Sequence, residues 1–445
     1  MLRTALLLLA LALATPAAAL DLERLVENLS PEQRARYAVF EDFTIHGICG
    51  SKELELARDF GVNTIRNYTI KLENNETKNL LDRAHALGLK VIVSEWMPHQ
   101  GENKGEHGPW NFDYTKNVEQ RLAAFEEKVI ALGDHPAILM WGLGNEVHLD
   151  PEYLVYVNKL SELIHRHQPL AITSLTMINA KPEHIERIKQ HAPDLDVIGV
   201  QSYSPGAVRG GIRNMEEHWQ KPYYYSEFNG KGPWNFNKTD WGQAHEDLSN
   251  ARVADIHRSY DDIEAAPRCL GSTIFVWGHF NMNRPSYFSL LLSPHPEGPA
   301  AEQDTDLAGS YPLITPNAEV LAERFLGEVP GSNRAPRITA LTFHNNQRAL
   351  SAAPGEPIGV VVEATDANRD TLRTVAWVID NRAGRARAVA GPFEGDRRGR
   401  IRFDAPAEPS DRYLVIAYVL DDQGGAAAST LPLQVRPAGP SARAR

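Results

Sequence analysis

The chain has 445 residues, which is too many for one ordinary domain, and its 42% hydrophobic and 23% charged residues are normal for a folded, soluble protein. This composition excludes a largely disordered chain. The formal net charge of −11 argues against nucleic acid and anionic membrane surfaces as partners, and it fits a neutral or cationic substrate better than a polyanion.

The N-terminus has the pattern of an export signal. Arg3 supplies a positive charge, residues 5–14 are apolar, and residues 17–19 are three alanines that offer a cleavage site. We therefore expect residues 1–19 to be removed and the mature protein to be periplasmic or secreted. No later stretch is apolar over the roughly 20 residues that a spanning helix needs, so we expect no membrane insertion.

Short apolar runs then alternate with longer amphipathic stretches. The runs that predict strands are residues 43–49, 64–68, 91–96, 138–141, 171–175, 197–200, 223–226 and 273–277. The stretches that predict helices include residues 78–87, 118–132, 153–165 and 183–191. Eight such units in succession predict a parallel (β/α)8 TIM barrel over residues 20–330. An open doubly wound sheet also has alternating strands and helices. That fold would lead us to expect a Gly-rich phosphate loop after an early strand, and the sequence has none.

The chain has two cysteines, Cys49 and Cys269. The strand assignment places them at opposite ends of two neighbouring parallel strands, the first and the eighth. A disulfide bridges Cα atoms no more than about 7 Å apart. We therefore expect two free, buried thiols.

A second module follows the barrel. Residues 331–336 are typical of a linker, and beyond them the hydrophobic pattern changes to strict alternation, with turn residues between the runs. About seven short strands are expected, which predicts a small all-β, immunoglobulin-like sandwich over residues 331–437 and a disordered tail over residues 438–445. Four aspartates in this module could bind calcium but suit turns better: Asp366, Asp370, Asp421 and Asp422.

Two strand ends carry the most informative residues. The fourth strand runs into Asn145 and Glu146, and the seventh ends at Glu227. The carboxyl ends of barrel strands form the active-site face, so these two carboxyl groups should face each other across the barrel mouth. Cleavage of a glycosidic bond needs such a pair, one protonated and one ionised.

On these residues the chain resembles the clan of retaining (β/α)8 glycoside hydrolases that includes families 2 and 5, and it is closest to the family 2 catalytic domain. The resemblance spans roughly residues 43–326. It implies that Glu146 is the acid/base and Glu227 the nucleophile of a double displacement. It also implies that Arg66 keeps the nucleophile ionised, that Tyr203 hydrogen-bonds it, and that Trp277 forms the floor of a sugar subsite.

Other side chains near the strand ends are expected to contact the sugar. Those predicted to bind substrate are Arg66, Trp96, His99, Asn145, Tyr203, Trp234 and Trp277. For His99 a solvated loop position is the favoured alternative. Glu95 could line the substrate site, but it suits a salt bridge behind the site at least as well. No His-Glu-x-x-His pattern or close pair of histidines indicates a metal site, and the two-carboxylate chemistry needs no cofactor.

Three functions remain open at this point. The first is hydrolysis of a β-linked glucan, with β-1,3 linkages as the first choice. The second is transglycosylation by the same site, and the third is a non-catalytic glycan-binding or structural protein with a degenerate barrel. The presence of both carboxylates argues against the third. In each case a carbohydrate is the expected partner, and the chain is expected to be a monomer.

Overall fold

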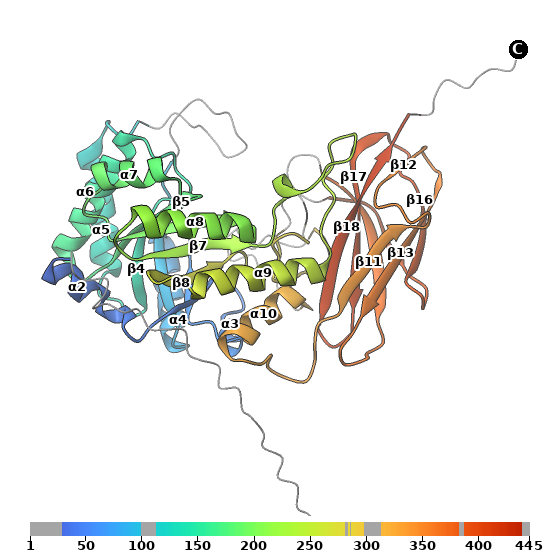
Figure 1. Ribbon diagram of the computed structural model, residues 1–445, viewed down its shortest axis with the longest axis horizontal. Helices are drawn as coiled ribbons and strands as arrows, with labels where there is room; N and C mark the ends of the chain where they lie inside the picture. Colours follow the sequence, from blue (N-terminus) through green and yellow to red (C-terminus); the bar gives the residue numbers. More distant parts are fainter. Residues whose placement is uncertain are drawn as a thin grey trace, which may run out of the picture.

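A computed structural model describes residues 29–98, 113–280, 284, 286–297, 313–381 and 387–437 (Figure 1). The expected export signal and the C-terminal tail lie outside these residues. Among the helices that the structure describes, none is long and apolar enough to cross a membrane.

Eight parallel strands form a closed barrel. They are β1 (Ile45–Cys49), β2 (Thr64–Arg66), β3 (Lys90–Glu95), β4 (Ile138–Leu143), β5 (Thr173–Ile178), β6 (Val197–Tyr203), β7 (Tyr223–Asn229) and β8 (Cys269–Ile274). The strands follow one another in chain order, and the pairing of β1 with β8 closes the ring. Most strand residues are buried because helices cover the outside and side chains fill the inside.

Helices surround this barrel. They are α2 (Pro31–Tyr37), α3 (Leu54–Asp59), α4 (Glu76–Ala86), α5 (Val118–Leu132), α6 (Pro151–His167), α7 (Pro182–His191), α8 (Pro205–His218), α9 (Ser249–Glu264) and α10 (Pro316–Phe325). In α6, Val157, Leu160 and Ile164 recur at helical spacing and are fully buried. Hydrophobic contact with the strands therefore fixes the helices on the barrel.

The predicted TIM barrel is confirmed, and the first seven strands begin within two residues of their predicted starts. The eighth strand begins at Cys269, four residues earlier than predicted, and ends at Ile274. Both cysteines are free as predicted. Cys49 is buried, whereas Cys269 is only partly buried, because it starts the strand and lies at the edge of the barrel.

The C-terminal part contains two all-β sheets. Their strands are β11 (Arg337–Phe343), β12 (Leu350–Ala352), β13 (Pro357–Thr365), β14 (Arg373–Asp380), β15 (Arg387–Glu394), β16 (Arg400–Asp404), β17 (Ser410–Leu420) and β18 (Ala426–Val435). One sheet has the order β11-β13-β16, and the other has the order β12-β18-β17-β14-β15. Residues of both sheets share one hydrophobic core. The immunoglobulin-like topology stays a prediction.

Buried polar contacts join these sheets to the barrel beside α9, where Figure 1 shows the two parts in contact. The fully buried carboxylate of Glu246 accepts hydrogen bonds from Arg252 (2.6 Å), Ser286 Oγ (2.8 Å), and both the backbone N (2.9 Å) and Oγ1 (2.6 Å) of Thr430 in β18. Arg252 also donates to the carbonyl of Ala428 at 2.7 Å. One buried carboxylate thus holds three separate segments together.

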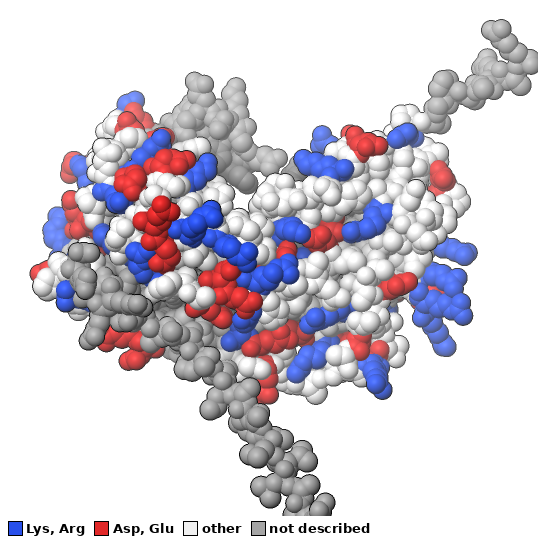
Figure 2. Space-filling view, viewed as in Figure 1, with Lys and Arg blue, Asp and Glu red and all other residues white. Residues whose placement is uncertain are grey.

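Charged groups on the surface are mixed in sign. Figure 2 shows basic and acidic side chains interspersed over both parts of the face in view. Some form exposed ion pairs, such as Arg83 with Glu55 (2.6 Å) and Arg373 with Glu394 (3.1 Å). Exposed pairs of this kind contribute little to stability, roughly 0–1 kcal/mol each.

Candidate active site

Four barrel strands bring polar side chains together at their carboxyl ends. Arg66 ends β2, Asn145 and Glu146 follow β4, Gln201 lies in β6, and Glu227 lies in β7. Beside them is a cavity of about 1100 Å³. This is the face on which TIM-barrel active sites are built.

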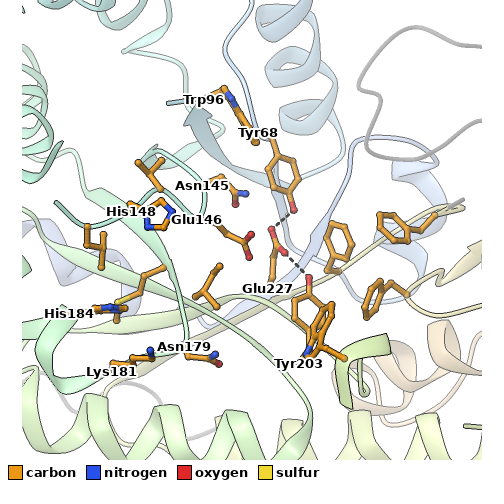
Figure 3. A pocket seen from close by; sticks show the side chains of 18 of the residues that line it. Tyr68, Trp96, Asn145, Glu146, His148, Asn179, Lys181, His184, Tyr203 and Glu227 are labelled. Atoms are coloured by element: carbon orange, nitrogen blue, oxygen red, sulfur yellow. Dashed lines mark hydrogen bonds between the residues drawn. The ribbon is translucent and has the colours of Figure 1, made fainter. Parts of the chain in front are cut away.

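Glu227 is held by four donors. Its Oε1 accepts hydrogen bonds from Arg66 Nη1 (2.8 Å), Tyr68 Oη (2.8 Å) and Gln201 Nε2 (2.9 Å), and its Oε2 accepts one from Tyr203 Oη (2.7 Å). Figure 3 shows the two tyrosines reaching the carboxylate from opposite sides. The side chain is nearly buried, and it forms an ion pair with the guanidinium group of Arg66.

An irregularity in strand pairing places Glu227 where these donors meet. Val200 of β6 lies opposite Tyr225 of β7, but the next β6 residue, Gln201, lies opposite Glu227, so Ser226 is an extra residue on β7. A bulge of this kind bends the strand and redirects its side chains. Glu227 therefore lies directly beside Gln201.

Glu146 has a different environment. Its side chain makes no hydrogen bond within the part of the chain that the structure describes. Burial, together with the negative charge of Glu227, raises its pKa to about 7, and the charge of Arg66 only partly opposes this. Its backbone is left-handed, with φ of 55°, directly after Gly144 and Asn145. In Figure 3 its carboxyl group points into the same space as that of Glu227.

Asn145 contacts two of the residues that donate to Glu227. Its Oδ1 accepts hydrogen bonds from Arg66 Nη2 and Gln201 Nε2, both at 2.7 Å. The carbonyl end of the amide is therefore occupied, and its NH2 group is left as a donor. Because Asn145 lines the cavity, that donor is available to a hydroxyl group of a bound molecule.

Aromatic rings form much of the cavity wall. Those lining it are Tyr68, Trp96, Tyr203, Trp234, Phe275, Phe280, Tyr287 and Phe288. Trp96 and Trp234 are 45% and 61% exposed. Trp234 packs edge-on against Tyr203, with ring centres 5.5 Å apart. An extended wall of rings suits the apolar faces of sugar rings.

The structure corrects the prediction for Trp277. This residue is fully buried and does not line the cavity; its ring packs against Phe60 (5.9 Å between centres), and its Nε1 donates to the Glu53 carbonyl at 3.3 Å. Because β8 ends at Ile274, Trp277 lies beyond the strand, inside the wall of the barrel. Phe275 is the residue of this segment whose ring reaches the cavity.

The other predicted residues are divided between the cavity and its surroundings. Trp96, Asn145, Tyr203 and Trp234 line the cavity together with the two glutamates. Arg66 is fully buried behind Glu227, so it reaches the carboxylate but not the cavity. His99 lies outside the described residues.

Glu95 does not line the cavity. Its carboxylate forms a salt bridge with Lys128 of α5 at 2.5 Å. Burial raises the pKa of Glu95, and the lysine opposes this rise. The position behind the site agrees with the salt-bridge alternative.

Sequence reasoning missed two donors to Glu227. Tyr68 lies two residues beyond Arg66. A polar side chain just after a strand end is a feature that could have identified it as a site residue. Gln201 was noticed only as a variation on a family pattern, although its amide contacts both Glu227 and Asn145. Its contacts depend on the bulge, which the sequence does not reveal.

A candidate metal cluster lies outside this site. Among the described residues, the acidic groups close enough to share an ion are Asp366, Asp370 and Asp421, in the C-terminal sheets. Asp421 Oδ1 accepts from the backbone N of Gln423 (2.7 Å) and Gly425 (2.8 Å), and Asp366 accepts from the backbone N of Asp370 (3.0 Å). These are turn contacts, as the sequence predicted for such residues.

Comparisons with known proteins show distant structural likeness. No protein family matches the chain by sequence, and no curated protein matches it. It is similar to a β-glucuronidase of Bacteroides uniformis (14% identity, 90% of this chain and 47% of that chain, TM-score 0.46). It is also similar to a GH2 β-galacturonidase of Eisenbergiella tayi (15% identity, 66% of this chain and 52% of that chain, TM-score 0.46). A third similar structure is the GH53 catalytic domain of Ignisphaera aggregans (14% identity, 56% of this chain and 83% of that chain, TM-score 0.39). The chain spans about half the length of the first two.

Proposed function

We propose that this protein is a retaining β-glycoside hydrolase in which Glu227 is the nucleophile and Glu146 is the acid/base. The observation that carries the proposal is the contrast between two carboxyl groups in one cavity. Glu227 receives four hydrogen bonds, whereas Glu146 has a pKa of about 7. Double displacement at a sugar needs one ionised and one protonated carboxyl group.

In the first step, Glu227 attacks the anomeric carbon and the glycosidic C–O bond breaks. The proton of Glu146 passes to the departing oxygen, leaving a glycosyl ester on Glu227. Three of the four donors occupy Oε1, so Oε2, which is bonded only to Tyr203, is the oxygen better placed to attack. Arg66 and Tyr68 hold the carboxylate in position during this step.

In the second step, Glu146 takes a proton from water, and the water oxygen attacks the anomeric carbon. The ester bond breaks, and Glu227 is released as a carboxylate. The two inversions restore the β configuration. An acceptor sugar in place of water gives a transglycosylase with the same residues.

We propose a β-linked glucan as the substrate, with β-1,3 linkages as the first choice, and export as the route to it. Support comes from the volume of the cavity, about 1100 Å³, and from the aromatic rings in its wall. The NH2 group of Asn145 offers a donor beside the two carboxyl groups.

The test is product analysis of β-1,3-glucan incubated with the wild type and with Glu227→Gln, with anomeric configuration followed by NMR. We expect shorter products with initial β configuration and a loss of at least about 10³-fold in the variant. Glu95→Gln is the matched control, since it changes another strand-end glutamate outside the cavity. Longer products would assign transglycosylation, and initial α products would contradict retention. Binding without turnover of any β-glycan would favour the non-catalytic alternative.

A further inference from the structure

One end of the active-site cavity is cationic. Lys181 is the N-cap of α7, and His184 and Arg187 follow within the helix at three-residue spacing. The three residues therefore lie on one side of the helix, and all three line the cavity. We call these three residues the cationic end. The side chains of Lys181 and Arg187 form no ion pair or hydrogen bond with any residue of the described chain.

The neighbouring lysine on the same helix behaves differently. Lys189, which does not line the cavity, pairs with Glu186 at 2.9 Å and donates to a backbone carbonyl at 3.4 Å. The helix therefore neutralises a cation outside the cavity and leaves those inside it without a partner. An unpaired cation beside a cavity is available to a ligand.

His184 and Asn179 supply further hydrogen-bonding groups at this end. Nδ1 of His184 is buried and has no hydrogen-bond partner. Burial lowers the pKa of this histidine, Glu183 opposes the shift, and the charges of Lys181 and Arg187, with His148, lower it further. Asn179 accepts a hydrogen bond from Ser202 through Oδ1 (3.2 Å), which leaves its NH2 group as a donor.

Acidic groups are few at this end. Besides the two proposed catalytic residues, Asp150 is the acidic residue among those that line the cavity. The net charge of −11 is spread over the whole chain, and charges more than about 10 Å away are largely screened by salt. The local field from Lys181 and Arg187 therefore decides which ligands this end favours.

The cationic end lies on the side of the cavity where Glu146, the proposed general acid, is found. In Figure 3, His148, His184 and Lys181 lie on the same side of Glu227 as Glu146, whereas Tyr203 lies on the other side. A general acid donates its proton to the departing oxygen. If Glu146 has that role, the cationic end faces the sugar that leaves.

We propose that the cationic end binds an anionic group, a carboxylate or a sulfate, carried by the leaving-group side of the glycan. This inference rests on the proposed function for its orientation. It refines the expectation from net charge, which favoured a neutral or cationic substrate: the cavity is locally suited to an acidic glycan.

The test compares three probes with the same backbone: neutral β-1,3-glucan oligosaccharides, their carboxymethylated form and their sulfated form. For the double variant Lys181→Gln/Arg187→Gln, we expect kcat/KM on the better charged probe, relative to the neutral one, to fall about tenfold. Lys189→Gln, on the same helix but outside the cavity, is the matched control and should leave this ratio unchanged. An equal loss on charged and neutral probes would overturn the proposal. The charged probe that shows the larger loss identifies the anionic group.

Binding separates this inference from the proposed function. Calorimetry with Glu227→Gln measures affinity for the same probes without turnover. We expect tighter binding of a charged probe than of the neutral one, weakened about tenfold by the double substitution and by added salt. Binding of a charged probe without hydrolysis by the wild type would reject only the hydrolase assignment. Failure of both charged probes to bind better than the neutral one would reject the cationic end as an anion site.

Discussion

At the residue scale, Glu227 and Glu146 are the same type of side chain, and only their surroundings differ. Glu227 receives hydrogen bonds from residues of β2 and β6 or just beyond β2, and Glu146 lies buried beside a negative charge. Charged donors stabilise an anion, and burial stabilises a neutral acid. The proposed roles of nucleophile and acid rest on this difference.

The pH dependence of activity tests the role of Glu146. We expect kcat/KM to fall as pH rises through about 7, because the carboxyl group loses the proton that the departing oxygen needs. Glu146→Gln should remove this alkaline limb and lower the rate on poor leaving groups about 10²–10⁴-fold. Rate profiles with aryl β-glycosides of differing leaving groups provide the measurement. If the fall of kcat/KM at alkaline pH persists in Glu146→Gln, a group other than Glu146 causes it.

Substitution of Tyr68 tests a donor that sequence reasoning missed. Tyr68→Phe removes one of three hydrogen bonds to Glu227 Oε1. Hydrogen bonds to charged groups are worth about 1.5–3 kcal/mol, so we expect kcat/KM to fall roughly 10- to 100-fold. Trp96→Phe, farther from the carboxylate on the same cavity wall, provides a comparison, since it should act mainly on KM. Full activity of Tyr68→Phe would show that Arg66 and Gln201 suffice.

At the scale of elements, the inside of the barrel leaves little room beside Glu227. Gly199 of β6 faces Ser226, the residue before Glu227, and Thr176 of β5. A Cβ atom at Gly199 would lie 2.9 Å from the Cβ of Ser226 and 2.9 Å from Thr176 Cγ2. Real Cβ contacts are longer, so one of the three strands would have to move.

Gly199→Ala is therefore expected to destabilise the barrel. Forcing extra volume into a packed interior costs about 1–3 kcal/mol of the free energy of unfolding. Gly210→Ala in α8 is the matched control: no atom lies within 4 Å of its added Cβ, and alanine there should stabilise the helix by roughly 0.5–1 kcal/mol. Denaturant unfolding of both variants measures the difference. Equal free energies of unfolding for the two variants would mean that β6 and β7 can move apart without loss of stability.

At the scale of the whole molecule, the C-terminal sheets contribute to the active-site wall. Thr430 of β18 donates twice to Glu246, which also accepts from Ser286 Oγ, directly before Tyr287 and Phe288. Both of these rings line the cavity. Arg284, on the other side of this turn, donates to Thr430 Oγ1 at 3.1 Å. The second module thus fixes the segment that carries two rings of the wall.

Thr430→Val tests this connection, because it keeps the shape of the side chain and removes its hydroxyl group. Loss of a partner to a buried charged group costs about 1–3 kcal/mol, and we expect lower stability with faster hydrogen exchange over residues 286–292. KM for oligosaccharides should rise more than kcat falls, and Thr430→Ser should restore both. A change in stability alone, with unchanged KM, would make the contact purely structural.

The sequence by itself determined the barrel, seven of its eight strand starts to within two residues, and the two glutamates. Strand periodicity and strand ends are local features, so they can be read along the chain. The tertiary structure decided which side chains surround Glu227, that Phe275 rather than Trp277 reaches the cavity, and that Lys181 and Arg187 line it. It also joined Thr430 to the active-site wall. These relations depend on a bulge, on where β8 ends, and on contacts between distant segments, and none of these is a property of neighbouring residues in the sequence.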